Sequence, residues 1–272
     1  MTRLATYVSG SAPEVIVALH GVTDNAPSLA GIAQRWNGEY RVVLVDSLGH
    51  GLSPRLTEVE AADPVGSCTG AVIEVVEEQA AHAASGKVTL MGHSMGGAIA
   101  TLVAAARPEL VKALVLEDPA WLTETQAAAY KRGAEDEIGR LRAITANPAA
   151  AIERALEDHP GRQVRELGAW STAKGQVDVR LVRTGVVGLV VPRQHLASQI
   201  AVPCLLLTGD QPGVLFTDED IASIVSVGNP LLRTSTIVGA GHSIRRDRPE
   251  EFYEAVEAFL REVQNADGMH AH

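Results

Sequence analysis

A serine in the first half of the chain lies between two glycines in the pattern G-x-S-x-G. The pattern covers residues 92–96, and its serine is Ser94. An apolar run at 87–91 precedes it and a helical stretch at 95–106 follows it. A helix packed tightly against the preceding strand leaves room only for glycine at the flanking positions, so the serine lies on a strained turn with its hydroxyl exposed. This arrangement predicts that Ser94 is a nucleophile.

A serine hydroxyl is a poor nucleophile without a neighbouring base. The chain has nine histidines, and His242 follows an apolar run at 231–238 and precedes the last helical stretch at 250–264. Loops at the carboxyl ends of parallel strands meet at one edge of a sheet. We therefore expect His242 to reach Ser94 and to act as its general base.

An acid is needed to orient the histidine and to stabilise its cation. Asp210 follows the apolar run at 202–208 after a single glycine, Gly209, and it is our predicted acid. Asp118 follows the run at 111–117. It is the main alternative, because it too lies at the end of a strand. Asp218 and Asp220, in the next loop, are further competitors.

Attack on a carbonyl creates a negative oxygen that hydrogen-bond donors must stabilise. The N–H of Met95, at the start of the helix after Ser94, is one predicted donor. The other is the N–H of Val22, in the loop that follows an apolar run at 14–19. Gly21 allows the backbone of that loop to turn close to the site. We predict that Val22 and Met95 form the oxyanion hole.

The strands that position these loops are visible as short β-branched runs, most of them followed by a helical stretch. This alternation predicts a parallel sheet with helices on both faces, and the nearly continuous apolar character is typical of strands buried on both sides. The alternation stops at residue 119. Residues 120–200 are mostly helical and much longer than a crossover needs. We therefore predict a core of residues 1–119 and 201–272 with a helical cap at 120–200. The predicted strands are 14–19, 40–46, 87–91, 111–117, 202–208 and 231–238.

Two groups of side chains are candidates for substrate binding. Trp121 and Trp170 lie in the predicted cap, where they either line an apolar pocket as substrate-binding residues or hold the cap down. Arg245, Arg246 and Arg248 follow His242 closely. We interpret these arginines as a solvated face that pairs with the acidic surface; the alternative is that they attract a carboxylate-bearing substrate.

The composition excludes several classes of function. The chain has 272 residues, 46% of them hydrophobic, and its formal net charge of −10 disfavours nucleic acid as a partner. Its two cysteines, Cys68 and Cys204, make no disulfide framework, and the sequence shows no Cys/His cluster for a metal. Apolar stretches are too short for a membrane span, and the N-terminus lacks the apolar stretch of a signal peptide. We expect a cytoplasmic monomer or homodimer that acts on a small molecule without a cofactor or metal.

Taken together, these motifs resemble those of the α/β-hydrolase superfamily over nearly the whole chain. His20 and Gly21 match its oxyanion loop, residues 46–53 resemble its D-x-x-G-H-G-x-S turn, and the order Ser94, Asp210, His242 is the chain order of its catalytic triad. The resemblance implies a mostly parallel sheet flanked by helices, with an inserted helical cap. It also implies that the N-terminal hairpin of the family is shortened here, to about residues 4–8.

The implied activity is that of a serine hydrolase. It would cleave a carboxylic ester, thioester or lactone through an acyl-enzyme on Ser94. The alternatives are a carbon–carbon bond (diketone) hydrolase or an amide hydrolase with the same triad. A hydrolase-like ligand-binding protein with slow turnover is a third reading. A serine rather than an aspartate at the turn argues against the haloalkane dehalogenase and epoxide hydrolase branches.

Overall fold

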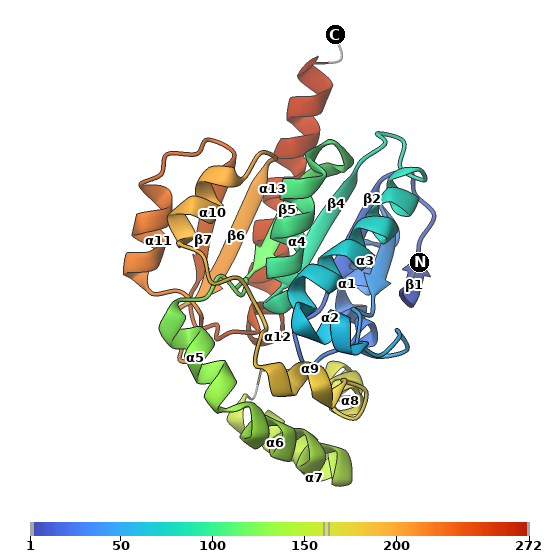
Figure 1. The fold of residues 1–272 in the computed structure, drawn as a ribbon. Coiled ribbons are helices and arrows are strands. Elements are labelled where there is room, and N and C mark those ends of the chain that lie inside the picture. Colours follow the sequence, from blue (N-terminus) through green and yellow to red (C-terminus); the bar gives the residue numbers. More distant parts are fainter. Residues whose placement is uncertain (1–2, 160, 163, 271–272) are drawn as a thin grey trace.

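A seven-stranded sheet forms the centre of the computed structural model, which describes residues 3–159, 161–162 and 164–270 (Figure 1). The strand order is β1-β3-β2-β4-β5-β6-β7. All neighbouring strands are parallel except β1, which runs antiparallel to β3. The predicted α/β fold with a mostly parallel sheet is confirmed. The strands are β1 (Thr6–Ser9), β2 (Val15–Leu19), β3 (Arg41–Val45), β4 (Val88–His93), β5 (Val111–Glu117), β6 (Cys204–Gly209) and β7 (Leu232–Ile237).

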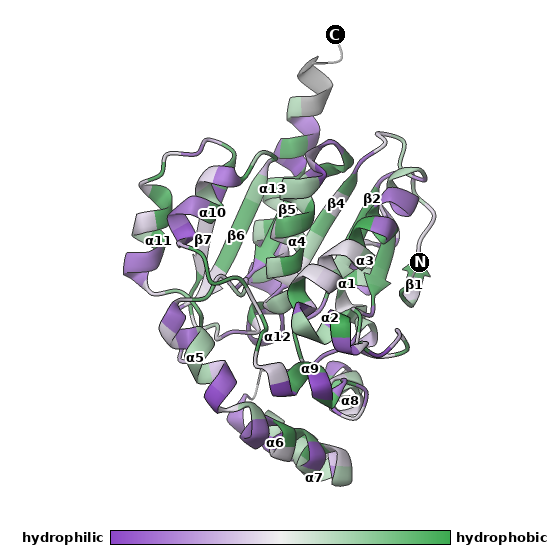
Figure 2. Cartoon of the chain, in the orientation of Figure 1, coloured by the Kyte–Doolittle hydropathy of each residue, from purple (hydrophilic) through white to green (hydrophobic). Residues whose placement is uncertain are grey.

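The central strands are apolar because both of their faces are covered. All five residues of β2 are buried, and alternate side chains enter different clusters. Val15, Val17 and Leu19 belong to one core cluster, whereas Ile16 and Ala18 belong to the other. Successive side chains of a strand point to opposite faces, so this division gives the sheet two hydrophobic cores. Figure 2 shows the hydrophobic colour along these strands.

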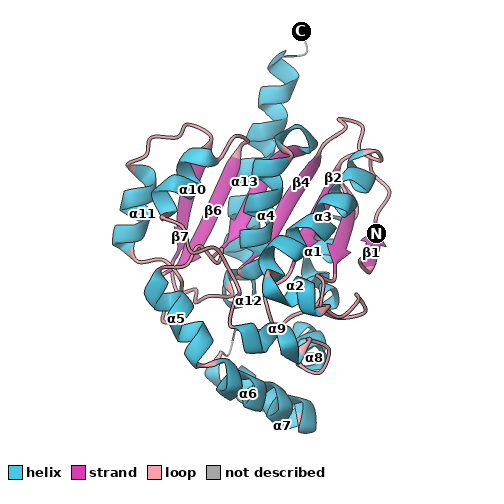
Figure 3. Cartoon of the chain, in the orientation of Figure 1, coloured by secondary structure: helices cyan, strands magenta, loops and turns pink. Residues whose placement is uncertain are grey.

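Helices cover the two faces of the sheet (Figure 3). Residues of α3 and α4 pack in the cluster on one face, and residues of α1 and α13 pack in the cluster on the other. The core helices and short turns are η1 (Ala26–Leu29), α1 (Ala30–Trp36), α2 (Glu58–Ala62), α3 (Pro64–Ala80), α4 (Met95–Ala106), η2 (Pro108–Leu110), α11 (Asp218–Val225), α12 (Ile244–Asp247) and α13 (Pro249–His270).

The chain between β5 and β6 is helical, and Figure 1 shows α5 to α9 at the lower edge of the sheet and α10 beside α11. Leu181 of α9, and Leu196 and Ala197 of α10, are buried in the same core cluster as residues of α3 and α4. We call the segment from α5 to α9 the cap. The inserted helices are α5 (Glu124–Arg132), α6 (Ala134–Ala146), α7 (Pro148–Asp158), α8 (Val164–Ala173), α9 (Val179–Thr184) and α10 (Arg193–Gln199).

Hydrogen bonds attach the cap to the core at the start of α9. The Asp178 N–H donates to the Gly49 carbonyl over 2.7 Å, and the Asp178 carboxylate accepts from the Leu56 N–H over 3.1 Å. These bonds hold the cap beside the loop that follows β3. None of the helices in the described part of the chain combines the length and the apolar character of a membrane span.

The end of β6 has no room for a side chain at Gly209, which provides a test of the fold. A Cβ atom on Gly209 would lie 1.9 Å from the Ala240 carbonyl oxygen, in the loop before His242. We expect Gly209→Ala to lower the free energy of unfolding by about 1–3 kcal/mol or more, because the backbone must move. Urea unfolding monitored by circular dichroism measures this change.

Gly70 is the matched control, because it is exposed within α3 and a Cβ atom there would meet nothing within 4 Å. Gly70→Ala should raise the free energy of unfolding by about 0.5–1 kcal/mol. Equal stability of the two variants would contradict the tight packing at Gly209.

Candidate active site

Ser94 lies at the junction of β4 and α4 in a conformation that non-glycine residues rarely adopt. Its φ is 51° and its ψ is −117°. The glycines around it are required by packing. A Cβ atom on Gly92 would lie 2.3 Å from the Gly96 carbonyl oxygen, and one on Gly96 would lie 2.6 Å from the His20 carbonyl oxygen. The steric reason for the G-x-S-x-G pattern is therefore present, and Ser94 lines a cavity.

His242 lines the same cavity as Ser94, and its hydrogen-bond partner is Asp118. The distance between His242 Nδ1 and Asp118 Oδ2 is 2.5 Å. The Asp118 carboxylate is fully buried and also accepts from the Thr208 hydroxyl (2.8 Å) and from the Leu215 N–H (3.0 Å). These donors hold the carboxylate in one orientation beneath the imidazole.

The predicted partner of His242, Asp210, lies elsewhere. Its side chain is exposed, and its Oδ1 accepts from the Gly239 N–H over 2.7 Å and from the Gln211 side chain over 2.9 Å. The prediction of Asp210 at the histidine is wrong, and the alternative, Asp118, occupies that position. Both residues follow the end of a strand, but only Asp118 turns under the His242 loop, with a φ of 40°.

The peptide that joins Gly21 to Val22 is held by two hydrogen bonds to its carbonyl. The Gly21 carbonyl accepts from His20 Nδ1 (2.8 Å) and from the Asp24 N–H (3.0 Å). In a trans peptide the N–H points away from the carbonyl, so these bonds fix the direction of the Val22 N–H. Val22 lines the cavity with Ser94. The N–H of Met95 begins α4 and has no acceptor within its own helix.

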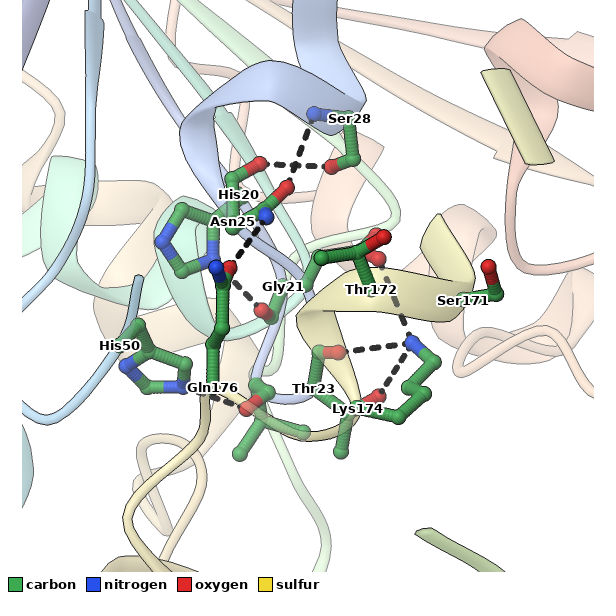
Figure 4. Close-up of polar contacts among 12 residues, drawn as sticks. His20, Gly21, Thr23, Asn25, Ser28, His50, Ser171, Thr172, Lys174 and Gln176 are labelled. Carbon is green, nitrogen blue, oxygen red and sulfur yellow. Dashed lines mark hydrogen bonds and ion pairs between the residues drawn. The ribbon is translucent and has the colours of Figure 1, made fainter. Parts of the chain in front are cut away.

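His20 is held in a single neutral form by its neighbours (Figure 4). The Ser47 N–H donates to His20 Nε2 over 3.1 Å, so the ring proton is on Nδ1, where it donates to Gly21. Burial lowers the pKa of His20 to about 4. His50 Nε2 lies 2.5 Å from the Val22 carbonyl, and burial lowers the pKa of His50 to about 4 as well. Two neutral histidines thus support the predicted oxyanion loop.

His93, the residue before Ser94, supports the opposite side of the site. Its Nε2 donates to the backbone carbonyl of His242 over 2.9 Å, and the two rings lie 4.8 Å apart. Burial, with the nearby His242 and Arg246, lowers the pKa of His93 to about 3. This role of His93 was not predicted from the sequence, although its position next to the serine was a signal for it.

The cavity at Ser94 has a volume of about 480 Å³ and lies between the core and the cap. The cap contributes Tyr130 from α5 and Trp170 from α8 to its walls. Trp170 thus lies where the sequence predicted it. Trp121 does not: it is fully buried, its Nε1 donates to the Thr101 hydroxyl (3.0 Å), and it packs edge-on against Phe216. The prediction that Trp121 lines the substrate pocket is wrong. The contacts of Trp121 fit the alternative prediction, in which it holds the inserted region on the core.

The arginines after His242 also differ from the predicted solvated face. Arg245 and Arg246 are only 4% and 7% exposed, whereas Arg248 is exposed. Arg246 lines the cavity together with Lys174, a buried residue that follows α8. Sequence reasoning named Arg246 only as part of the arginine run and missed Lys174, because their acidic partner, Asp24, is far from them in the chain. No group of three or more His, Cys, Asp or Glu side chains suited to a metal ion occurs among the described residues.

The buried histidines make stability depend on pH. Their pKa values are about 4, 4 and 3 in the folded protein and about 6.5 in the unfolded chain, so only the unfolded chain takes up protons between these limits. We expect the free energy of unfolding to fall as the pH drops from 6.5 towards 4. Each histidine contributes up to about 1.4 kcal/mol per pH unit. Urea unfolding between pH 7.5 and 5 measures the slope.

A substitution of one of these histidines isolates its share of that slope. His20→Gln should reduce the slope, and His82→Gln, at an exposed position, should leave it unchanged. A free energy of unfolding that stays constant between pH 7 and 5 would contradict the neutral state of these rings.

Known proteins with the same architecture include several hydrolases. The chain is 26% identical to 2-(acetamidomethylene)succinate hydrolase from Mesorhizobium japonicum, over 92% of this chain and 89% of that protein. It is 24% identical to the esterase YbfF from Escherichia coli, over 91% and 93%. The crystal structure of an enol-lactonase from Burkholderia xenovorans matches with a TM-score of 0.73 at 18% identity, over 95% of this chain and 96% of that one.

A family model gives the assignment. The model described as serine aminopeptidase, S33, matches residues 10–249, which include the Ser94 turn, Asp118 and His242. The sheet and the strand–serine–helix turn fit an α/β-hydrolase. The chain therefore belongs to the serine aminopeptidase S33 family of α/β-hydrolases and is a hydrolase.

Proposed function

We propose that this protein cleaves a carboxylic ester, thioester or lactone through an acyl-enzyme on Ser94. The observation that carries the proposal is the 2.5 Å contact between His242 and the buried carboxylate of Asp118, beside Ser94 in the same cavity. Relatives named as an esterase and an enol-lactonase support the type of bond. Asp118 takes the place that the sequence analysis gave to Asp210.

In the proposed first step, the Ser94 hydroxyl attacks the substrate carbonyl while His242 Nε2 takes its proton. Asp118 accepts from His242 Nδ1, which leaves Nε2 free to act as the base and stabilises the imidazolium that forms. The N–H groups of Val22 and Met95 donate to the oxyanion of the tetrahedral intermediate. This intermediate collapses when His242 gives its proton to the leaving oxygen or sulfur.

The second step releases the acid. His242 takes a proton from water as the water attacks the acyl-enzyme, and the bond between the acyl carbon and Ser94 Oγ breaks. Ser94 recovers its proton from His242. His93 has a positioning role in both steps, because its ring donates to the backbone of His242.

Removal of the nucleophile tests the proposal directly. Ser94→Ala should abolish labelling by a fluorophosphonate probe and lower the hydrolysis of p-nitrophenyl esters by roughly 10⁶-fold, because no acyl-enzyme can form. Intact-mass spectrometry measures the labelling. Persistent labelling of the variant would reject Ser94 as the nucleophile.

The identity of the acid is tested by two isosteric substitutions. Asp118→Asn should lower kcat by roughly 10⁴-fold, because an amide no longer favours the reactive tautomer of His242. Asp210→Asn, the matched control, should change kcat by less than about 3-fold, since the Asp210 side chain is exposed and bonded to Gly239. The reverse pattern of losses would restore Asp210 as the acid.

The same assay separates the other activities that this triad supports. A p-nitroanilide series tests amide hydrolysis, and a vinylogous 1,5-diketone tests cleavage of a carbon–carbon bond. Stoichiometric labelling of Ser94 without turnover of any of these substrates would favour a ligand-binding protein of slow turnover.

A further inference from the structure

We propose that the substrate carries a carboxylate close to the bond that is cleaved, and that Arg246 binds this carboxylate. The inference rests on the proposed function, because it names the class of substrate for the same cavity. It arises from the charges on the wall beside Ser94, where two buried cations share one carboxylate.

Arg246 lies four residues after His242, in the short helix α12, and its side chain lines the cavity. Its Nη2 donates to Asp24 Oδ2 over 2.8 Å, and its Nε is fully buried, 3.8 Å from Glu166 Oε2, so Nε does not face the cavity. Within the described part of the chain, no group accepts from its Nη1. A guanidinium that is 7% exposed and has unused donors is costly to bury. An anion in the cavity would complete its hydrogen bonds.

Lys174 reaches the same carboxylate from the cap. Its Nζ lies 3.3 Å from Asp24 Oδ1 and donates to the carbonyl and the hydroxyl of Thr23 over 2.7 and 3.1 Å (Figure 4). The three protons of the ammonium group are therefore in use. Burial lowers the pKa of Lys174 to about 8, so the group is mostly charged at pH 7. Lys174 adds positive potential to the wall, and Arg246 supplies the free donor.

The other charges around this wall are already paired. Glu137 and Arg140, also at the cavity, form a bidentate pair of 2.7 and 2.5 Å. Behind Arg246, Arg245 forms an ion pair of 2.7 Å with Glu166, whose other oxygen lies 3.8 Å from Arg246 Nε. Among the carboxylates, lysine and arginines that line the cavity, the two cations on Asp24 therefore leave an excess of one positive charge. One excess positive charge and one free planar donor group on the wall match a carboxylate, which carries one negative charge. They match a doubly charged phosphate less well.

A pair of esters of equal size tests the inference. Mono-p-nitrophenyl glutarate carries a carboxylate, and the p-nitrophenyl ester of glutaric acid monoamide replaces it with an uncharged amide. We expect kcat/KM to be at least about 10-fold higher for the carboxylate ester. Arg246→Met should lower this ratio by roughly 10- to 100-fold, the range of a charge-assisted hydrogen bond. Arg246→Lys should lower it less.

Arg248→Met is the matched control, because it removes an arginine two positions away that is exposed. It should leave the ratio unchanged. A wild-type ratio near one, or an equal loss of the ratio in Arg246→Met and Arg248→Met, would overturn the inference.

Binding without turnover separates this inference from the proposed function. In Ser94→Ala protein, millimolar glutarate should raise Tm, whereas glutaramide should not; this result supports the site even if Arg246→Met fails to fold. If glutarate stabilises the protein but no ester is cleaved by the wild type, the proposed function fails and the anion site stands. If both esters are cleaved equally and glutarate gives no shift, the anion site fails and the hydrolase stands.

Discussion

The tight turn at Ser94 is the constraint on which the site depends. Helix α4 packs so closely against β2 and β4 that side chains at Gly92 and Gly96 would collide with backbone atoms. Ser94 is held at a positive φ as a result. Strain of this kind persists only where the surrounding structure fixes it. Here the buried strands on both sides fix it, so the position of one hydroxyl group at the cavity depends on the packing of both hydrophobic cores.

Neutral imidazoles support the loops around that hydroxyl. His20 and His93 each donate one hydrogen bond to a backbone carbonyl, and burial keeps both uncharged. A charged side chain in either place would add its field to the proposed site of the oxyanion. Charge is instead concentrated at Asp118 on one side and at the cations around Asp24 on the other. Polar groups that orient the backbone are thus kept distinct from groups that act by charge.

The sequence predicted the elements whose signal is local. Strand β5 and helix α4 match their predicted ranges, because apolar runs and glycine positions mark them directly. The sequence brought Ser94 and His242 to one cavity for the same reason, since each follows a recognisable strand.

The carboxylate that contacts His242 could not be chosen from the sequence. Asp118 and Asp210 follow adjacent strands in similar contexts, and the difference between them is the direction in which each side chain turns. The burial of Arg246 could not be predicted from the sequence either, because its partner Asp24 lies 222 positions earlier in the chain. Trp121 was misjudged because its place in the inserted region suggested a pocket, whereas its ring packs against the core.

The attachment of the cap has a consequence for how this enzyme can change. Lys174 and Gln176 of the cap bind Thr23 and Asn25, in the loop that also contains Val22 (Figure 4). The cap, which lines the cavity, is therefore hydrogen-bonded to the loop that we propose holds the reacting oxygen. Exchange of the cap for that of a relative would alter the loop as well as the choice of substrate. New specificities are thus more accessible through single residues on the cavity wall than through the transplantation of a whole module.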